Sequence, residues 1–373
     1  MDFLFSTEQE TFQRQVRQVA QDNVTKELNS MNADIFPKNS IQTMAEQGLL
    51  GIPIPAEYGG LGKDYISYIM TIHELSKVSA SVGVILSVHT SVATNPILQF
   101  GTEEQKKYYL PKLASGDYLG AFALTEPSAG SDAAKLKLKA TRQDDVYILN
   151  GSKIFITNGN EADSFITFAR TGNEKGAKGI SAFIVEKNTP GFSVGTSEEK
   201  MGLHGTSTVT LHFDHCKIPI SQRLGEEGQG FHIAMANLNG GRIGIAAQAL
   251  GIAEAAYEYT REWARHLPEQ EQHLLFTLAD MATKVEAAKL MVYRAASLME
   301  KEKKCIREVS TAKLLATRTA REITIDAIQT VGYEAARKGS PLERYFRDAK
   351  VTEIYEGTSE IQKVVISKQL AQS

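Results

Sequence analysis

A carboxylate near the end of the sequence stands where it could act as a proton-abstracting base. Glu356 lies in the run Ile354-Tyr355-Glu356-Gly357-Thr358-Ser359-Glu360-Ile361-Gln362, in which Gly357 breaks a helical pattern and Thr358 or Ser359 caps a new helix. Such a turn faces a helix N-terminus, whose free N–H groups favour developing negative charge. We expect the break to let Glu356 point into a pocket, although on residue types alone a solvated loop glutamate is the more common case.

Two further segments have residue types that suit a flat polar ligand. The run Phe122-Ala123-Leu124-Thr125-Glu126-Pro127-Ser128-Ala129-Gly130-Ser131-Asp132 leaves a strand pattern for a loop whose N–H groups and hydroxyls can bind a heterocycle or a phosphate. The run from Lys153 to Gly159 places Phe155 and Thr157 on one face of a strand, as an aromatic platform beside a hydroxyl. An ordinary surface turn for the first and core packing for the second remain open alternatives.

A pair of glycines interrupts the helical pattern at Asn239-Gly240-Gly241-Arg242. Each glycine inside a helix costs about 1 kcal/mol relative to alanine, so the pair indicates that something approaches the backbone closely. A neighbouring helix and a ligand chain are equally good candidates. Arg242 would meet an anionic group or pair with a carboxylate.

Three blocks of hydropathy pattern must position these segments. Apolar residues recur every three to four positions from Ser6 to about residue 115, alternate between about residues 117 and 219, and return to the helical period from about Gly230. The predicted fold is mainly α with a central β-barrel. Its expected parts are an N-terminal helical domain (1–116), a middle β-barrel domain (117–222) and a C-terminal four-helix bundle (223–373).

Composition narrows the function classes. The net charge of −3 provides no global field for nucleic acid or an anionic membrane. Cys216 and Cys305 lie far apart without a metal-ligand pattern or a disulfide framework. We identify no signal peptide, and we expect no run of about 18 apolar residues without a charge. We expect a cytoplasmic protein with no metal, nucleic-acid or membrane partner.

Taken together, these segments resemble the acyl-CoA dehydrogenase family over nearly the whole chain. Leu124 to Asp132 resembles the family's first signature, and Tyr345 to Lys350 followed by Ile354 to Gln362 resembles its second. Gly241-Arg242-Ile243-Gly244-Ile245-Ala246 is most similar to the short-chain, butyryl-CoA branch. The resemblance implies an FAD-dependent oxidoreductase of fatty acid metabolism (β-oxidation) that converts a short- or medium-chain acyl-CoA to the trans-2-enoyl-CoA.

The resemblance also implies roles for individual residues. Glu356 matches the family base, and the place where one branch carries its base instead is here Gly241. The residues implied to contact FAD are Phe122, Leu124, Thr125, Ser131, Phe155 (in place of the usual Trp), Thr157, Gln329, Thr358 and Glu360. Those implied to contact the acyl-CoA substrate are Ser131, Asn239, Arg242, Tyr355 and Gly357. The implied partners are an electron-transfer flavoprotein and further copies of the chain, as a tetramer or dimer.

Two family motifs are altered, and both serve the FAD pyrophosphate and adenine across a dimer interface. Arg261 to Pro268 replaces the usual Arg-x-x-Phe-Gly, and Gln329-Thr330-Val331-Gly332-Tyr333 stands where a Gly-Gly run normally follows Gln. These changes motivate one alternative function, a flavin-poor acyl-CoA binding or interaction protein. A further alternative is an acyl-CoA oxidase, or a dehydrogenase of an acyl-carrier-protein thioester.

Overall fold

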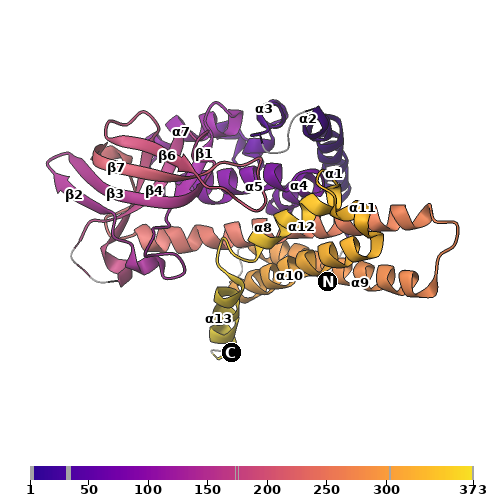
Figure 1. Cartoon of the computed structure of the whole chain (residues 1–373). Coiled ribbons are helices and arrows are strands. Elements are labelled where there is room, and N and C mark those ends of the chain that lie inside the picture. Colours follow the sequence, from indigo (N-terminus) through magenta and orange to yellow (C-terminus); the bar gives the residue numbers. More distant parts are fainter. Residues whose placement is uncertain (1–3, 31–34, 173, 175, 302–303, 372–373) are drawn as a thin grey trace.

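The N-terminal part of the chain is helical, as predicted. The computed structural model describes residues 4–30, 35–172, 174, 176–301 and 304–371 (Figure 1). Its first helices are α1 (Thr7–Val19), α2 (Thr25–Ser30), α3 (Lys38–Glu46), α4 (Tyr65–Val78), α5 (Ala80–Ser87), α6 (Asn95–Phe100) and α7 (Glu103–Ser115), with π-helical turns at Ala20–Val24 and Val88–Thr94. A capping box is present at α1, where Ser6 Oγ accepts from Gln9 N at 3.2 Å and Gln9 Oε1 accepts from Ser6 N at 3.0 Å.

One apolar stretch corrects the expectation drawn from charge spacing. Ala80–Phe100 forms 21 helical residues that are long and apolar enough, by length and composition, to cross a membrane. The expectation that no such stretch exists is wrong, because its scattered Ser, Thr and His residues hid an uncharged run. In the structure 89% of its most apolar 18-residue window is buried against other parts of the chain, as in a core helix.

The middle part is a sheet of eight strands. They are β1 (Gly120–Ala123), β2 (Lys139–Gln143), β3 (Val146–Thr157), β4 (Ser164–Arg170), β5 (Ile180–Glu186), β6 (Phe192–Ser197), β7 (Thr208–Pro219) and β8 (Arg223–Leu224). The order is β6-β7-β3-β2-β4-β5-β8, with β1 parallel to β4. Among the described residues β6 does not pair with β8, so the paired strands of this β domain follow an open path.

Alternation along the strands gives the sheet two apolar faces. In β4, Phe165 joins a core cluster on one face with Phe183 and Phe213, whereas its neighbour Ile166 joins a cluster on the other face with residues of α7 and α8. Short 3₁₀ turns lie at Leu49–Gly51, Ala56–Tyr58, Ala133–Lys135, Gly176–Gly179 and Ile220–Gln222. The sheet is therefore held on one side by its own aromatic core and on the other by helices.

The C-terminal part is helical again, which confirms the predicted order of helices, β domain and helices. Its elements are α8 (Gly230–Arg265), α9 (Gln272–Glu300), α10 (Ile306–Val331), α11 (Tyr333–Ala336), α12 (Pro341–Thr352) and α13 (Ser359–Leu370). Helix α8 begins against the β domain and continues along α4, α9 and α10, so one helix touches all three parts (Figure 1). The division at residues 116 and 222 stays a prediction.

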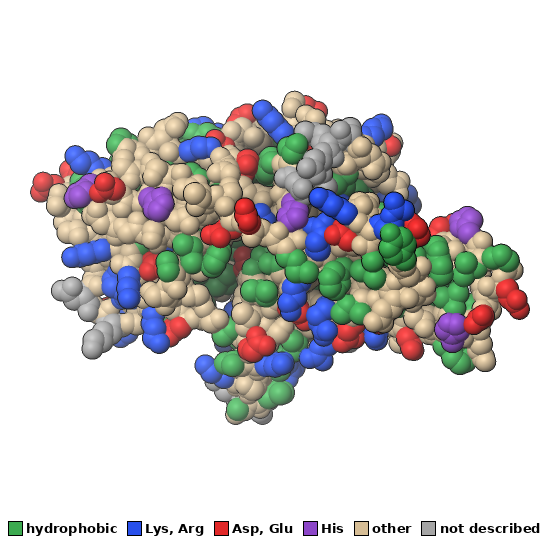
Figure 2. Space-filling view, viewed as in Figure 1, with side chains coloured by type: hydrophobic (Ala, Val, Ile, Leu, Met, Phe, Trp, Pro, Cys, Tyr) green, Lys and Arg blue, Asp and Glu red, His purple; other side chains and the backbone are tan. Residues whose placement is uncertain are grey.

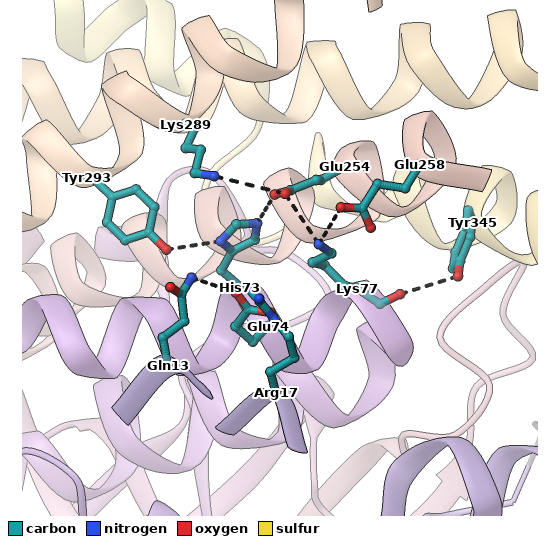
Figure 3. Close-up of polar contacts among 10 residues, drawn as sticks. All are labelled: Gln13, Arg17, His73, Glu74, Lys77, Glu254, Glu258, Lys289, Tyr293 and Tyr345. Carbon is teal, nitrogen blue, oxygen red and sulfur yellow. Dashed lines mark hydrogen bonds and ion pairs between the residues drawn. The ribbon is translucent and has the colours of Figure 1, made fainter. Parts of the chain in front are cut away.

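A polar network joins α4 to the bundle (Figure 3). His73 of α4 lies between two partners: its Nε2 is 2.6 Å from Glu254 Oε2 on α8, and its Nδ1 is 3.0 Å from Tyr293 Oη on α9. Lys77 donates to Glu254 at 3.3 Å and to Glu258 at 2.8 Å. Burial disfavours ionisation of Glu254, but His73 and Lys77 outweigh it and hold the pKa of that carboxyl well below its ordinary range.

Candidate active site

Glu356 occupies a strained turn between α12 and α13. Its φ is 52° and that of Gly357 is 92°, so two successive residues adopt the left-handed conformation, which a glutamate rarely does. Helix α12 already ends at Thr352, ahead of the break predicted at Gly357. Thr358 caps α13 as predicted, because its Oγ1 accepts from Ile361 N at 3.3 Å. This turn directs the Glu356 side chain toward α8.

The carboxylate of Glu356 rests on the backbone of Gly241. A Cβ atom added to Gly241 would lie 2.5 Å from Glu356 Oε2 and 2.8 Å from its Cδ, so no other residue type fits without moving this carboxylate. At Gly240 the nearest atoms to such a Cβ would be Tyr65 Oη at 3.4 Å and Ser91 Cβ at 3.5 Å. The close approach predicted from the glycine pair is therefore made at Gly241 by the Glu356 side chain and at Gly240 by residues of neighbouring helices. A ligand chain in the same place stays a prediction.

The inner oxygen of this carboxylate receives no hydrogen bond from the described residues. Glu356 as a residue is only half-buried, whereas its Oε2 is shielded from solvent and has no hydrogen-bond partner within the described ranges. Burial raises the pKa of Glu356 to about 7, and the positive charges of Lys313 and Arg242 partly oppose that rise. The solvated-loop alternative is thus wrong for this carboxylate, which is poised to accept a proton near neutral pH.

Two cations approach Glu356 from different helices. Arg242 is buried on α8, where its Nη1 donates to Asn239 Oδ1 at 3.1 Å and its Nε has no partner. Burial lowers the pKa of Arg242, and Glu356 opposes that effect. Lys313 of α10 is 1% exposed, and its Nζ donates to the carbonyl oxygens of Thr352 at 3.0 Å and Gly357 at 2.8 Å.

Lys313 was missed from the sequence. A lysine in an exposed-looking helix is ordinarily a surface residue, and no motif singles this one out. The available signal was its position: Lys313 follows Val309 by four residues and precedes Ala316 by three, so it lies inside the apolar stripe of α10.

The predicted aromatic platform faces outward. Phe155 lies at a β-bulge, because the pairing of β3 with β7 shifts register between Lys153 and Ile156. Its φ is 58° and its side chain is 57% exposed, so core packing is wrong for this residue. Thr157 follows on β3, half-buried and paired with Thr208.

A buried ion pair shapes the loop from Leu124 to Asp132. The Glu126 carboxylate accepts hydrogen bonds from Lys153 Nζ at 2.8 Å, Lys137 N at 2.6 Å and Leu138 N at 2.9 Å. The same Lys153 Nζ donates to Leu124 O at 3.0 Å, so one ammonium group of β3 holds both Leu124 and Glu126 of the loop. Burial lowers the pKa of Lys153 to about 8, with Glu126 opposing that effect. This pair was also missed from the sequence.

Some of the predicted contact residues of this loop are exposed, and others are packed against the core. Ser131 is exposed and Thr125 is half-buried, with Thr125 O accepting from Ile154 N at 2.9 Å. Leu124 lies in the apolar core, and the half-buried ring of Phe122 meets Phe168 edge to face at 5.0 Å. The loop therefore offers its hydroxyls and backbone, rather than its apolar side chains, to a ligand.

The remaining residues of the second signature lie around the base. Tyr355 is half-buried, and its hydroxyl bonds with Gln248 of α8. Gly357 offers its carbonyl to Lys313 and to Gln362 Nε2, the latter at 2.9 Å. Glu360 is exposed in the first turn of α13. Figure 2 shows the surface hollowed between the β domain and the bundle, with hydrophobic side chains gathered on both sides.

Gln329 does not join this site within one chain. It lies 16 residues beyond Lys313 on α10, which is about 24 Å along a helix. There it lines a separate cavity of about 510 Å³. The other lining residues are Trp263, Leu267, Glu269, Glu271, His273, Leu274, Thr277, Asp326 and Thr330. Glu356 is not among the residues that line this cavity, so the cavity is separate from the Glu356 site.

Known proteins match the chain from end to end. Acyl-CoA dehydrogenase domains match in order: N-terminal at residues 6–117, middle at 121–216 and C-terminal at 228–371. An acyl-CoA dehydrogenase of Bacillus subtilis (strain 168) is 55% identical over 370 residues, covering 97% of this chain and 98% of that protein.

Two solved structures share the fold over their whole length. Butyryl-CoA dehydrogenase from Megasphaera elsdenii has a TM-score of 0.95 at 42% identity and covers 100% of both chains. A chain in a structure described as the electron transferring flavoprotein of Acidaminococcus fermentans has a TM-score of 0.97 at 45% identity, again covering 100% of both chains.

Proposed function

This chain belongs to the acyl-CoA dehydrogenase family, and on that premise we propose that it dehydrogenates a short-chain acyl-CoA thioester to the trans-2-enoyl-CoA, with Glu356 as the base. The observation that carries the proposal is the buried Glu356 carboxylate without a protein donor. A carboxylate in this state is a stronger base than one in water, because nothing in the protein stabilises its charge by a direct bond.

The proposed proton transfer uses groups of this turn. The α-proton of a thioester is a weak acid, so the developing enolate must be stabilised as the proton moves to the Glu356 carboxylate. Among the residues that the structure describes, the backbone N–H of Glu356 has no acceptor, which leaves it available to the thioester oxygen. Arg242 and Lys313 add positive charge near the place where negative charge is neutralised.

The family is FAD-dependent, and the residues on the β domain fit a flavin. An exposed aromatic ring at a bulge, beside the Thr157 hydroxyl, suits a flat heterocycle. Thr125, Ser131 and the loop backbone would hold its polar edge, and Thr358 and Glu360 would lie toward the ribityl and phosphate end. When bound, FAD supplies the hydride-accepting redox chemistry that no side chain provides.

A further copy of the chain is part of this proposal. Gln329 lies about 24 Å along α10 from Lys313, and we propose that it contacts the cofactor of another protomer. We therefore retain a homodimer or homotetramer. The altered residues from Arg261 to Pro268 border the same cavity through Trp263 and Leu267.

A short acyl chain is favoured by the space beside the base. Tyr65 Oη donates to Gly240 O at 3.4 Å, and Tyr68 Oη donates to Ser87 O at 3.2 Å. The two rings meet edge to face at 5.5 Å, so they fill the region beside Gly240. Similarity to butyryl-CoA dehydrogenase from Megasphaera elsdenii supports the same chain length.

An electron-transfer flavoprotein is the proposed electron acceptor. Similarity to a chain in the structure described as the electron transferring flavoprotein of Acidaminococcus fermentans supports this partner. A cytoplasmic location also stays part of the proposal, since both cysteines are free and buried.

Anaerobic titration of the purified protein tests the function. A yellow protein whose flavin band bleaches with butyryl-CoA, and less with palmitoyl-CoA, is the expected result. A colourless protein that binds butyryl-CoA but stays inert with added FAD would favour the flavin-poor binder. Faster bleaching with butyryl-acyl-carrier protein than with butyryl-CoA would reassign the thioester carrier.

A further inference from the structure

Lys313 bonds to the backbone on both sides of the base. Thr352 O belongs to the last turn of α12, where carbonyls lack helical partners, and Gly357 O belongs to the residue after Glu356. One ammonium group therefore bridges the two ends of the turn that carries the carboxylate. Lys313 itself comes from α10, which packs against α8, α12 and α13.

The ammonium is buried without a direct counter-ion. Within the described part of the chain, no carboxylate oxygen lies within 4.0 Å of Lys313 Nζ. Burial lowers the pKa of Lys313 to about 7, with Glu356 opposing that effect first and Glu353 more weakly. A buried charge held only by carbonyls is costly, and an apolar residue of similar length would avoid that cost. Backbone closure alone therefore does not explain a lysine here.

We propose that Lys313 is a positioning residue for the base: its ammonium closes the Glu356 turn, and its buried positive charge favours the ionised carboxylate. The inference rests on the proposed function and deepens it. At low dielectric a charge acts over more than hydrogen-bond distance, so Lys313 can favour ionisation without donating to Glu356. A direct bond would occupy the lone pair that must receive the proton. Lys313 therefore has two separate effects: its hydrogen bonds hold the backbone of the turn, and its positive charge acts on the Glu356 carboxylate without a direct bond.

Other groups around the pair cannot replace Lys313. Arg242 faces Glu356 from α8, but its Nη1 bonds to Asn239 and not to the turn. From α4 and from the turn itself, Tyr68 and Tyr355 face the carboxylate, and burial raises the pKa of both, so they stay neutral near pH 7.

The test compares Lys313→Met with the unchanged holoenzyme across pH. Without the charge of Lys313, the pKa of Glu356 rises, so the acid limb of kcat/KM for butyryl-CoA should move to higher pH by about one unit. At pH 7 this shift should lower kcat/KM about fivefold, rising to about tenfold at lower pH and narrowing in alkali. Lys313→Gln, which keeps a donor for the turn carbonyls, should show the same limb shift with a smaller loss of kcat.

Arg318→Met is the matched control. Arg318 lies on the same helix and is exposed, so removing its charge should leave the acid limb in place because water screens it. Infrared titration of the Glu356 carboxyl, identified by difference from Glu356→Gln, gives a readout that needs no turnover. The carboxyl should titrate at higher pH in both Lys313→Met and Lys313→Gln.

The outcomes separate the two proposals. An unmoved limb and unmoved infrared titration in a folded Lys313→Gln protein would overturn the role of Lys313, as would an equal shift in Arg318→Met. If Lys313→Met does not fold, Lys313→Gln carries the test alone. Absence of turnover by the unchanged enzyme with every acyl-CoA would end the proposed function, while the infrared titration would still decide whether Lys313 governs Glu356.

Discussion

Two half-buried carboxylates near the same helix have opposite surroundings. Glu254 lies on α8, and Glu356 rests against Gly241 of α8, about 20 Å away along the helix. Glu254 is bonded by His73 and Lys77 (Figure 3), which hold its pKa far below the ordinary range. Glu356 Oε2 has no donor, and burial raises its pKa to about 7.

The difference teaches what makes a buried carboxylate structural or reactive. Burial penalises the charge of both groups, so the number of donors decides the outcome. Both oxygens of Glu254 have partners, and the contacts of this carboxylate link α4 to α8 and α9. Glu356 is left without donors at a strained turn, a locally unfavourable arrangement of the kind found at functional sites. The bundle supplies the stability that the turn lacks.

The largest expected effect is on turnover. Glu356→Gln keeps the size of the side chain but cannot accept the proton, so kcat with butyryl-CoA should fall by about three powers of ten. Binding of butyryl-CoA, measured by calorimetry, should change little. A variant with nearly full turnover would remove Glu356 from the role of base.

The second prediction concerns stability at the other carboxylate. Glu254→Gln leaves His73 and Lys77 without their shared partner, and the free energy of unfolding at pH 7 should fall by about 3 kcal/mol. Because the folded state lowers the pKa of Glu254, this contribution is present above the ordinary value of 4.5 and is lost as pH falls below it. Urea unfolding at pH 7 and pH 4 measures both effects.

A control distinguishes saturation from mere charge loss. Glu258 also pairs with Lys77, but its side chain is 40% exposed. Glu258→Gln should therefore cost less than about 1 kcal/mol. Equal losses at Glu254 and Glu258 would mean that the buried bonds to His73 contribute nothing special.

Local sequence signals predicted several parts of this comparison. The turn at Glu356, the Thr358 cap and the close approach at Gly241 all follow from residues near one another in sequence, where capping and glycine conformations are decided. The order of helices, strands and helices likewise follows from hydropathy periods. The residue roles implied by the family resemblance at the site remain predictions.

The missed features depend on contacts between distant segments. Lys313 meets Gly357 across 44 positions, and Lys153 meets Glu126 across 27. Neither pairing leaves a local pattern, because only tertiary packing decides which lysine in an apolar stripe is buried. The bulge that turns Phe155 outward is equally hidden, since strand alternation assumes a regular ladder.

A smaller effect on kcat is expected from adding a side chain at Gly241, against which the Glu356 carboxylate lies. In Gly241→Ala the new Cβ would lie 2.5 Å from Glu356 Oε2, so the carboxylate must move and kcat should fall about 30-fold. Gly240→Ala is the matched control, because its Cβ meets Tyr65 Oη only at 3.4 Å. Both variants gain helix propensity, so neither should unfold more readily. Equal losses of kcat in both would argue against a specific seat for Glu356 at Gly241.

The smallest expected effect sharpens the contrast between the two carboxylates. The folded state raises the pKa of Glu356 to about 7, so its contribution to stability falls as pH rises from 4.5 to 7. The pKa of Lys313 is lowered to about 7, so its contribution recovers as pH rises from 7 toward 10.5. Glu356→Gln removes the first effect but leaves Lys313 and Arg242 without their nearby negative charge. These changes oppose each other, and the free energy of unfolding at pH 7 should differ from the unchanged chain by about 1 kcal/mol or less. Urea unfolding at pH 5, 7 and 9 measures the balance, and a loss as large as that of Glu254→Gln would mean that Glu356 is held as a structural carboxylate after all.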